Sequence, residues 1–418
     1  MAAAEGAGLA LLHSHPMGRS WQGMSPDDIN AEQGNAGAVF GVTNRPFIGL
    51  TLAGNGAWSA RSWERVAPRK YERKWCATVR VVGERMKVHY FDHLAPPPRQ
   101  TAEQVRTISA WGDECQADLA RLRVGLIGAG SVGGVIAEAL ARTGFEDVLA
   151  LDFDIIEEHN LDRLQYATRA DIGRPKVEVL AEHLTARATA SPFSVETLQA
   201  AIYEEEGFRS ALDCDVLLSC VDRPWGRYVQ NLIAYAHLIP VFDGGIAVRT
   251  NRSRKLVAAD WRAHTATPTR PCLQCLGQYD PADVQLERQG FLDDPAYISG
   301  LPKDHPLRTR ENVFGFAMAC GSNQFLQMLA YNLAPLDLSN SGAQLYHFVG
   351  STLDTSPLKL CKPTCAFPGM IALGDDCGVI AIGDAPPARL RAETTESAAT
   401  RIDTRPWWLV ALLRLIGK

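Results

Sequence analysis

The pattern of apolar and polar positions changes near residue 95. Before that point, short apolar runs separated by polar residues favour strands at 36–42 (AGAVFGV), 46–53 (PFIGLTLA) and 77–91 (ATVRVVGERMKVHYF). A proline-rich stretch at 94–100 (LAPPPRQ) then predicts a linker. We therefore expect a first unit at 1–95 and a second unit after the linker.

After the linker, short apolar runs alternate with longer segments of helical period. A buried strand and glycine-rich turn at 123–130 precede a helix at 131–143 and a strand at 146–154. Further elements are expected as helices at 176–188, 225–238 and 312–333, and strands at 193–198, 214–222, 240–245 and 255–261. The alternation predicts an α/β fold with a doubly wound, mostly parallel, Rossmann-like sheet over 96–385.

The last region, 386–418, breaks this alternation. Residues 386–404 are polar and typical of a loose tail, whereas 406–418 (PWWLVALLRLIGK) are apolar apart from Arg414 and the final lysine. This run is shorter than the ~20 apolar residues of a membrane span. We expect a helix that packs on the body or on a second subunit, with binding to a membrane surface as the alternative.

Charge and cysteine content reduce the classes of function that fit this chain. The net charge of −5 gives no support for nucleic-acid binding, and no signal-peptide pattern appears at the start, so we expect a cytoplasmic protein. Ten cysteines in such a chain favour zinc binding or nucleophilic chemistry over disulfides.

The glycine-rich turn predicts a phosphate site. GAGSVG places Gly128, Gly130 and Gly133 in the G-x-G-x-x-G pattern, where main-chain amides and the start of a helix favour phosphate. Asp152 ends the next strand, at the distance where a carboxylate holds a ribose hydroxyl. On these residues alone, a nicotinamide-dependent oxidoreductase fits as well as an ATP-binding enzyme.

The polar residues that follow favour a triphosphate. Asn160, Arg163 and Lys176 offer an amide and two cations for phosphate oxygens. Asp222 ends the strand at 214–222, where a carboxylate would face the ligand crevice and could hold Mg²⁺.

Together these motifs resemble the ThiF/MoeB family of adenylating enzymes, which is related to the ubiquitin-activating enzymes. GAGSVGG, DFD, NLDR and GRPK follow in the family's order and spacing. The resemblance implies that Asp152 holds the ribose, that Asn160, Arg163 and Lys176 contact the phosphates, and that Asp222 binds magnesium. Arg223 departs from the family at the next position, where an asparagine usually follows that aspartate.

The resemblance also implies a reaction and partners. ATP would adenylate the C-terminal carboxylate of a ubiquitin-like or sulfur-carrier protein and release pyrophosphate, and a conjugating enzyme is a further possible partner. Arg106 matches the family's arginine that reaches the ATP of the other subunit, so a homodimer is expected.

Two cysteine pairs suggest a structural zinc site. Cys272 and Cys275 form C-x-x-C, and Cys361 and Cys365 form C-x-x-x-C, which together supply four thiolates. The alternative is reduced, buried cysteines. Other cysteines make poor nucleophile candidates, because Cys214, Cys220 and Cys320 lie in apolar runs and Cys377 follows two acids. A thioester step is therefore not expected.

The opening of the chain suggests a second metal site. His13, His15, Ser25 and Asp28 match the motif of JAB/JAMM metalloproteases, where two histidines and an aspartate hold zinc and the serine stabilises the oxyanion. The resemblance covers only the second part of that α/β fold, and the only upstream acid, Glu5, is too close to act as general base. A zinc isopeptidase acting on a ubiquitin-like protein is the alternative function.

Three explanations of this partial domain stay open: a start inside the gene, a degenerate scaffold, or a missing half supplied by another chain. Residues 1–95 alone are expected to lack peptidase activity. Pairing of a JAB-like and an activating domain resembles bacterial ubiquitin-like conjugation systems, some of which act in phage defence.

Overall fold

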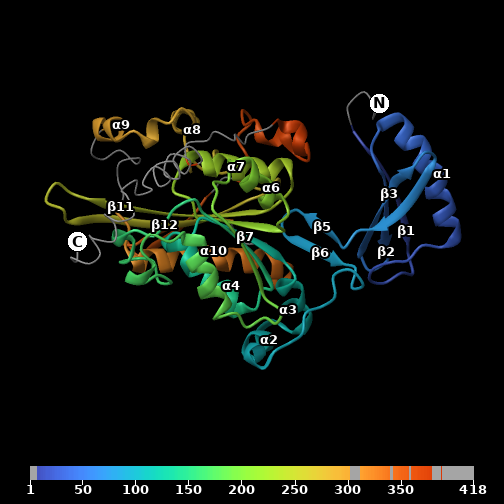
Figure 1. Cartoon of the computed structure of the whole chain (residues 1–418), viewed down its shortest axis with the longest axis horizontal. Helices are drawn as coiled ribbons and strands as arrows, with labels where there is room; N and C mark the ends of the chain where they lie inside the picture. Colours follow the sequence, from blue (N-terminus) through green and yellow to red (C-terminus); the bar gives the residue numbers. More distant parts are fainter. Residues whose placement is uncertain (1–6, 302–310, 339–341, 357–358, 379–386, 388–418) are drawn as a thin grey trace, which may run out of the picture.

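Three β-sheets of different size organise the chain (Figure 1). The computed structural model describes residues 7–301, 311–338, 342–356, 359–378 and 387. A four-stranded sheet with one helix forms the first unit, an eight-stranded sheet forms the second, and a two-stranded hairpin lies between them (Figure 1).

The first unit has strand order β1-β2-β3-β4. Its elements are β1 (Leu9–His15), α1 (Pro26–Thr43), β2 (Phe47–Ala53), β3 (Trp58–Ala67) and β4 (Lys70–Trp75). β1 pairs with β2 in parallel, and the other pairs are antiparallel. A small core of Ala36, Phe47 and Trp63 joins α1 to the sheet. β1 is an edge strand and contributes no side chain to that core.

One strand expected from the sequence is wrong, because residues 36–42 belong to α1. Ser25 caps this helix through a capping box with Asp28, and Pro26 occupies its first turn. The helix that begins at these residues continues through the Ala- and Gly-containing run at 36–42. It ends at Asn44, which adopts the left-handed conformation as C-cap. The strand expected at 46–53 is confirmed as β2.

The single strand expected at 77–91 is instead a hairpin of β5 (Thr78–Val82) and β6 (Met86–Tyr90), since the chain turns at Gly83–Arg85. This hairpin packs on the second unit. Met86 is buried in the larger core, Arg80 donates to the carbonyl of Cys214 at 2.8 Å, and Tyr331 donates to the carbonyl of Gly83 at 3.0 Å. The hairpin therefore shares the core of the second unit, while the boundary expected at residue 95 stays a prediction.

The large sheet has strand order β14-β13-β12-β11-β10-β7-β8-β9. Its strands are β7 (Arg123–Ile127), β8 (Asp147–Leu151), β9 (Ser194–Leu198), β10 (Val216–Ser219), β11 (Val241–Thr250), β12 (Leu256–Ala266), β13 (Ala343–His347) and β14 (Thr352–Thr355). The run from β11 to β9 is parallel, and the pairs from β11 to β14 are antiparallel. The mostly parallel sheet expected from the sequence is confirmed.

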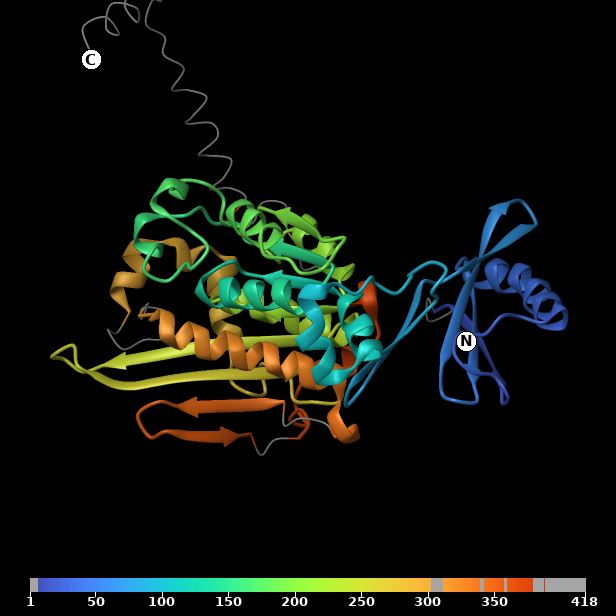
Figure 2. The same ribbon diagram turned by 90° about the horizontal axis from the view of Figure 1, so that it is seen from below.

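Helices cover both faces of this sheet (Figures 1 and 2). The helices are α2 (Val105–Trp111), α3 (Asp113–Ala120), α4 (Ser131–Thr143), α5 (Lys176–Thr185), α6 (Glu205–Leu212), α7 (Pro224–Ala236), α8 (Pro281–Arg288), α9 (Pro295–Gly300) and α10 (Phe314–Leu333). Side chains of α4, α5 and α10 form one core against the strands, and α6 and α7 form another on the opposite face.

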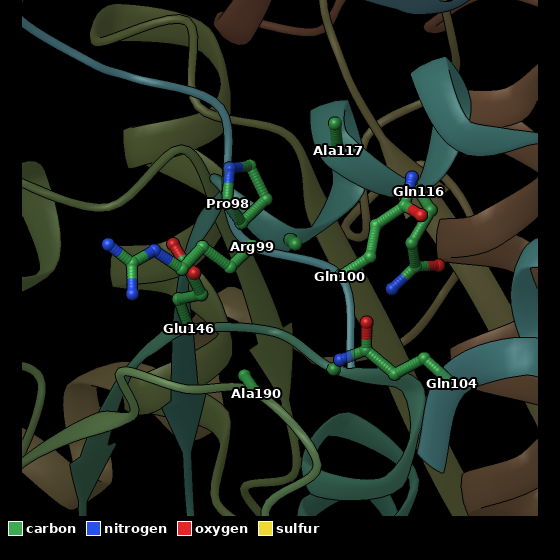
Figure 3. A pocket seen from close by; sticks show the side chains of 10 residues that line it. Pro98, Arg99, Gln100, Gln104, Gln116, Ala117, Glu146 and Ala190 are labelled. Carbon is green, nitrogen blue, oxygen red and sulfur yellow. The ribbon is translucent and has the colours of Figure 1, made fainter. Parts of the chain in front are cut away.

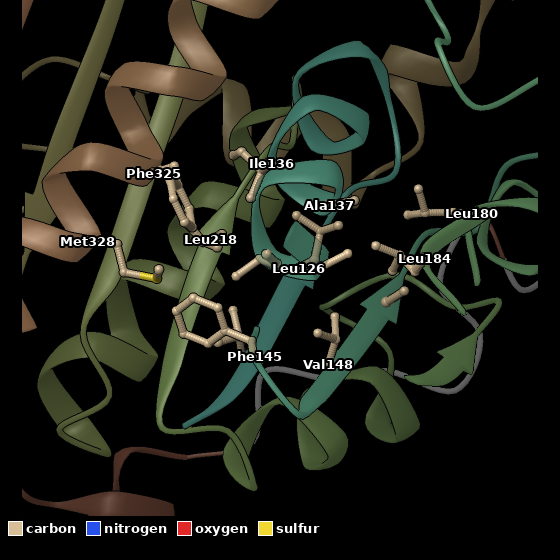
Figure 4. Close-up of a cluster of buried hydrophobic side chains, with 14 of the residues drawn as sticks. Leu126, Ile136, Ala137, Phe145, Val148, Leu180, Leu184, Leu218, Phe325 and Met328 are labelled. Carbon is tan, nitrogen blue, oxygen red and sulfur yellow. The ribbon is translucent and has the colours of Figure 1, made fainter. Parts of the chain in front are cut away.

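Figure 4 shows the first of these cores, where Leu126, Val148 and Leu218 of three parallel strands meet Ile136 and Phe325 of two helices. All five are at least nine-tenths buried. Because neighbouring strands bury side chains on both faces, their carboxyl ends are held in fixed register.

Among the helices that the structure describes, none is both long and apolar enough to cross a membrane. The polar tail and apolar stretch expected at 386–404 and 406–418 lie outside the described residues, apart from residue 387.

Candidate functional site

The glycine-rich turn links the end of β7 to the start of α4. Gly128 adopts φ +104°, and a Cβ there would come within 2.8 Å of the carbonyl oxygen of Cys220. A Cβ at Gly133 would collide with the carbonyl of Gly128. The fold itself therefore requires glycine at both positions.

Gly130 differs from its two neighbours. It is the N-cap of α4 with φ −70°, and a Cβ added there would meet nothing within 4 Å. Packing and backbone conformation do not explain this glycine. The open space beside the first turn of a helix is where main-chain amides receive an anion.

Asp152 follows β8 and closes the turn from the neighbouring strand. Its carboxylate accepts from the amide of Ala129 at 2.7 Å and from the amide of Asp154 at 2.8 Å. Burial and the nearby Asp154 raise the pKa of Asp152 to about 6, although Lys176 opposes the shift. The structure thus brings this carboxylate to the turn, as the sequence predicted.

Lys176, the first residue of α5, lies among carboxylates. Its Nζ is 2.7 Å from Asp154 Oδ2, and its side chain is only 10% exposed. Burial would lower the pKa of this amine. The carboxylates of Asp152, Asp154 and Asp222 instead raise the pKa of Lys176, so Asp222 also faces this region from the exposed loop after β10.

Asn160 and Arg163 hold the loop after β8 through local hydrogen bonds. Asn160 is buried and accepts from the amide of Glu157 at 3.1 Å. Arg163 donates from Nη1 to the carbonyl of His159 at 2.5 Å and to Asp162 at 2.8 Å. Both residues belong to the loop that joins Asp154 to Lys176.

Arg106 lies apart from these residues within one chain. It is exposed on α2, which packs against α3, and within the described residues it has no hydrogen bond or ion pair to the glycine turn or Asp222. Its expected role in a partner subunit stays a prediction.

A small pocket lies at the other end of the strands (Figure 3). Gln104, Gln116 and Glu146 line it together with the linker residues Pro98 and Arg99. Because Glu146 precedes β8 whereas Asp152 follows it, this pocket borders the amino edge of the sheet. It is separate from the glycine turn.

Several polar residues near Asp222 make contacts that no sequence pattern predicted. Arg223 pairs with Asp293 at 2.6 Å, and the fully buried Glu287 accepts from the amide of Trp225 at 2.8 Å, which caps α7 from α8. Asp243 forms a further cluster with two arginines, described below.

The four cysteines of the two pairs converge, with their Sγ atoms all within 4.8 Å of one another. Cys272 Sγ lies 3.6 Å from Cys365 Sγ. Main-chain amides donate to sulfur, from residue 272 to Cys361 at 3.2 Å and from Lys362 to Cys275 at 3.4 Å. Four sulfur atoms with such amide donors suit a tetrahedral zinc ion.

The remaining cysteines lack thiolate character. Burial raises the thiol pKa of all six: Cys76, Cys115, Cys214, Cys220, Cys320 and Cys377. The pKa of Cys320 rises to about 12, and Asp376 adds to the shift at Cys377. Raised pKa values favour the inert thiol form, and the absence of a thioester step stays a prediction.

The structure also brings together His13, His15 and Asp28. The Nε2 atoms of the two histidines lie 3.6 and 3.5 Å from the oxygens of Asp28. Ser25 donates to the Asp28 carboxylate at 2.8 Å and caps α1, so its observed role is to fix this aspartate. Glu5 lies outside the described residues.

A buried ion pair supports this second cluster. Glu32 of α1 pairs with Arg61 of β3, and both are almost completely buried. Arg61 donates to the Thr51 hydroxyl at 2.5 Å, and that hydroxyl lies 3.3 Å from His13 Nε2. Through Thr51, this network orients the His13 ring. Glu32 is already paired with Arg61, so its carboxylate is not free to act as a base.

Comparisons with known proteins follow this geometry. The chain is 28% identical over 165 residues to the SAMP-activating enzyme E1 of Haloferax volcanii, covering 40% of this chain and 57% of that protein. It is 28% identical over 166 residues to the sulfur carrier protein ThiS adenylyltransferase of Bacillus subtilis, covering 40% and 46%. The chain thus spans about half the length of these curated relatives.

A solved structure of E. coli MccB with ATP aligns with a TM-score of 0.48 at 16% identity, covering 64% of this chain and 74% of that one. The family model of ThiF matches residues 101–366, which is well over half of the sequence and includes the glycine turn, Asp152, Lys176 and Asp222. The chain belongs to the ThiF family.

Proposed function

We propose that this chain uses ATP to adenylate the C-terminal carboxylate of a ubiquitin-like or sulfur-carrier protein. The observation that carries the proposal is the meeting of Gly130, Asp152, Lys176 and Asp222 at the carboxyl edge of one parallel sheet. Relatives whose names state such activities, the SAMP-activating enzyme and the ThiS adenylyltransferase, support the substrate class.

In the proposed reaction, a carboxylate oxygen attacks the α-phosphorus of ATP. A new C–O–P linkage forms, the bond between the α-phosphorus and the β-bridging oxygen breaks, and pyrophosphate leaves with that electron pair. The amine of Lys176 and the amides at the start of α4 would stabilise the charge on the phosphate oxygens, while Asp152 would accept from the ribose hydroxyls.

Asn160 and Arg163 are proposed to contact the phosphates after the loop rearranges around ATP, since both now make local hydrogen bonds. Asp222 would hold Mg²⁺, which supplies charge neutralisation to the phosphates. Arg106 would serve the ATP site of a second copy in a homodimer. A conjugating enzyme and a bacterial conjugation pathway, including one in phage defence, belong to the same proposal.

Cys272, Cys275, Cys361 and Cys365 are proposed to hold a structural zinc ion. The site would tie the segment after β12 to the segment after β14, because the two pairs come from these separate parts of the chain.

Pyrophosphate exchange tests the adenylation proposal. Full-length chain is mixed with ATP, labelled pyrophosphate and small proteins ending in glycine that are encoded next to it. We expect exchange that requires one of them and is lost in Asp222→Asn. The control Asp213→Asn changes an exposed acid that follows α6. Absence of exchange with every candidate, or full exchange in Asp222→Asn, would contradict the proposal.

A second candidate function, a zinc isopeptidase of JAB type, is favoured by the convergence of His13, His15 and Asp28. Two imidazoles and a carboxylate suit zinc, which would supply an activated water when bound. Metal analysis of the full chain tests this. We expect one zinc fewer in the double variant His13→Ala/His15→Ala than in the wild type, and an unchanged zinc content sinks the idea.

A further inference from the structure

A buried carboxylate holds two arginines beside the proposed reaction site. Asp243 on β11 is fully buried and accepts from the Ser219 hydroxyl at the end of β10, at 2.9 Å. Arg227 of α7 donates from Nε to Asp243 Oδ1 at 3.2 Å, and Arg262 of β12 donates from Nη1 to Oδ2. One carboxylate therefore meets two guanidinium groups.

The charges in this cluster do not balance. Arg262 and Arg227 hold the pKa of Asp243 below its usual value, although burial opposes them. His264, opposite Asp243 in the β11–β12 register, adds no charge, because burial and Arg262 lower its pKa to about 3. Two cations and one anion leave a net positive charge, and each arginine side chain is still 13% exposed. Such a charge attracts an anion.

The cluster borders the loop that carries Asp222. Arg227 donates from Nη2 to the carbonyl of Val221 at 2.7 Å, and its Nη1 lies 3.5 Å from the carbonyl of Asp222. These contacts are to main-chain oxygens, so the arginine is anchored next to the proposed magnesium ligand without pairing with its carboxylate.

Arg262 keeps unused hydrogen-bond donors. Only its Nη1 has an acceptor within the part of the chain that the structure describes, which leaves Nε and Nη2 available. A Cβ at Gly245, its register partner on β11, would come within 2.8 Å of the guanidinium carbon. Glycine at 245 thus lets this side chain lie flat across the strand.

An extended peptide can approach this cluster along β11. β10 pairs with β11 only as far as Asp243, whereas β11 continues to Thr250 (Figure 1). On the β10 side, residues 244–250 of β11 therefore have no strand partner among the described residues. A strand edge of this kind can pair with the main chain of a bound peptide, and Gly244 and Gly245 present no side chain that would obstruct it.

We propose that Arg262 and Arg227, held on Asp243, bind the terminal carboxylate of a peptide that lies extended along the edge of β11. The guanidinium donors hold one carboxylate oxygen, and the other oxygen is left to attack the α-phosphorus. This assignment rests on the proposed adenylation, and it makes the two arginines the residues that select a free carboxyl terminus.

Peptide binding to the full chain tests this assignment. The probe is a fluorescent synthetic peptide ending in glycine, prepared as the free acid and as the C-terminal amide, with Mg²⁺ and a non-hydrolysable ATP analogue present. ATP binding is measured in parallel. Arg262→Lys keeps the charge but removes the planar fork. Arg142→Lys is the control, since Arg142 lies in the last turn of α4, outside the proposed peptide site, with a side chain 62% exposed.

We expect the wild type to prefer the acid to the amide by roughly tenfold, the value of one charge-assisted hydrogen bond. Arg262→Lys loses this preference with unchanged ATP affinity, and Arg142→Lys keeps it. A purely structural role for Arg262 would weaken both peptides alike.

A preference that survives in Arg262→Lys overturns the assignment, and so does a wild type that binds both peptides equally or binds neither. Loss of ATP binding with an intact acid preference contradicts the adenylation proposal instead, so the two failures are distinguishable.

Discussion

The two polar clusters of this protein are held in place in different ways. The residues around Lys176 follow strands of a parallel sheet that is buried on both faces by two large cores. His13 and His15 lie on β1, an edge strand whose Leu9, Leu11 and Leu12 are exposed. There, one capping box and one buried ion pair supply the rigidity. The first cluster is thus fixed by the whole fold and the second by a few local contacts.

The largest effect is expected from Lys176→Met. Removing the buried amine leaves the carboxylates of Asp152, Asp154 and Asp222 without their cation and removes a phosphate contact. Pyrophosphate exchange should fall by about 100-fold or more. Lys255→Met, on the exposed part of the β11–β12 hairpin, should keep full exchange. Equal rates in the two variants would show that Lys176 does not serve the reaction.

Removing one proposed zinc ligand should lower the melting temperature more in the second unit than in the first. Cys272→Ser changes a fully buried sulfur in one of the large cores, and zinc binding contributes folding free energy. Its melting temperature should fall by about 5 °C or more. His13→Ala changes a side chain that is 26% exposed at the sheet edge and should cost less. Calorimetry gives both melting temperatures, and metal analysis gives the zinc content of each variant. A larger fall in His13→Ala than in Cys272→Ser would contradict this comparison.

A substitution in the glycine turn should lower the stability of the fold without changing a charged or polar side chain. In Gly133→Ala the new methyl group meets the carbonyl of Gly128, so unfolding free energy should fall by about 2 kcal/mol. Gly300→Ala is the control, because a Cβ there meets no atom of the described residues within 4 Å. Urea denaturation of both variants checks this, and equal midpoints would argue against the close approach at Gly133.

The smallest effect concerns pH. Burial raises the pKa of Glu287 to about 7, above its ordinary value of 4.5. The folded state then favours the protonated acid, so the stability that this group contributes is full below pH 4.5 and is lost as the pH rises through 7. Glu287→Gln removes this titration. Its melting temperature relative to the wild type should rise by a few degrees between pH 5 and pH 8, and a constant difference would contradict the assignment.

Sequence predicted the site best where its residues are close along the chain. The glycine turn, Asp152 and Lys176 lie within one β-α-β unit, and the pattern of that unit fixes their relation. Each cysteine pair likewise has recognisable spacing. The pairing of Asp243 with Arg227 and Arg262 joins β11, α7 and β12, and no local pattern marks such a meeting.

The wrong strand at 36–42 has a physical reason as well. Residues 36–42 contain alanine and glycine, and their apolar run fits a strand as readily as the end of a helix. The deciding signal was the capping box of Ser25 and Asp28, which begins α1. The same two residues also match a metal-site motif, and that interpretation hid their role as a helix start.

ATP binding to the full chain, compared between the wild type, Gly130→Ala and His13→Ala, tests the central claim most directly. The added methyl group at Gly130 meets no atom within 4 Å, so it leaves the fold intact and fills only the space beside the first turn of α4. We predict that Gly130→Ala keeps the wild-type melting temperature and loses ATP binding, while His13→Ala binds ATP normally. Undiminished ATP binding by Gly130→Ala would contradict the account.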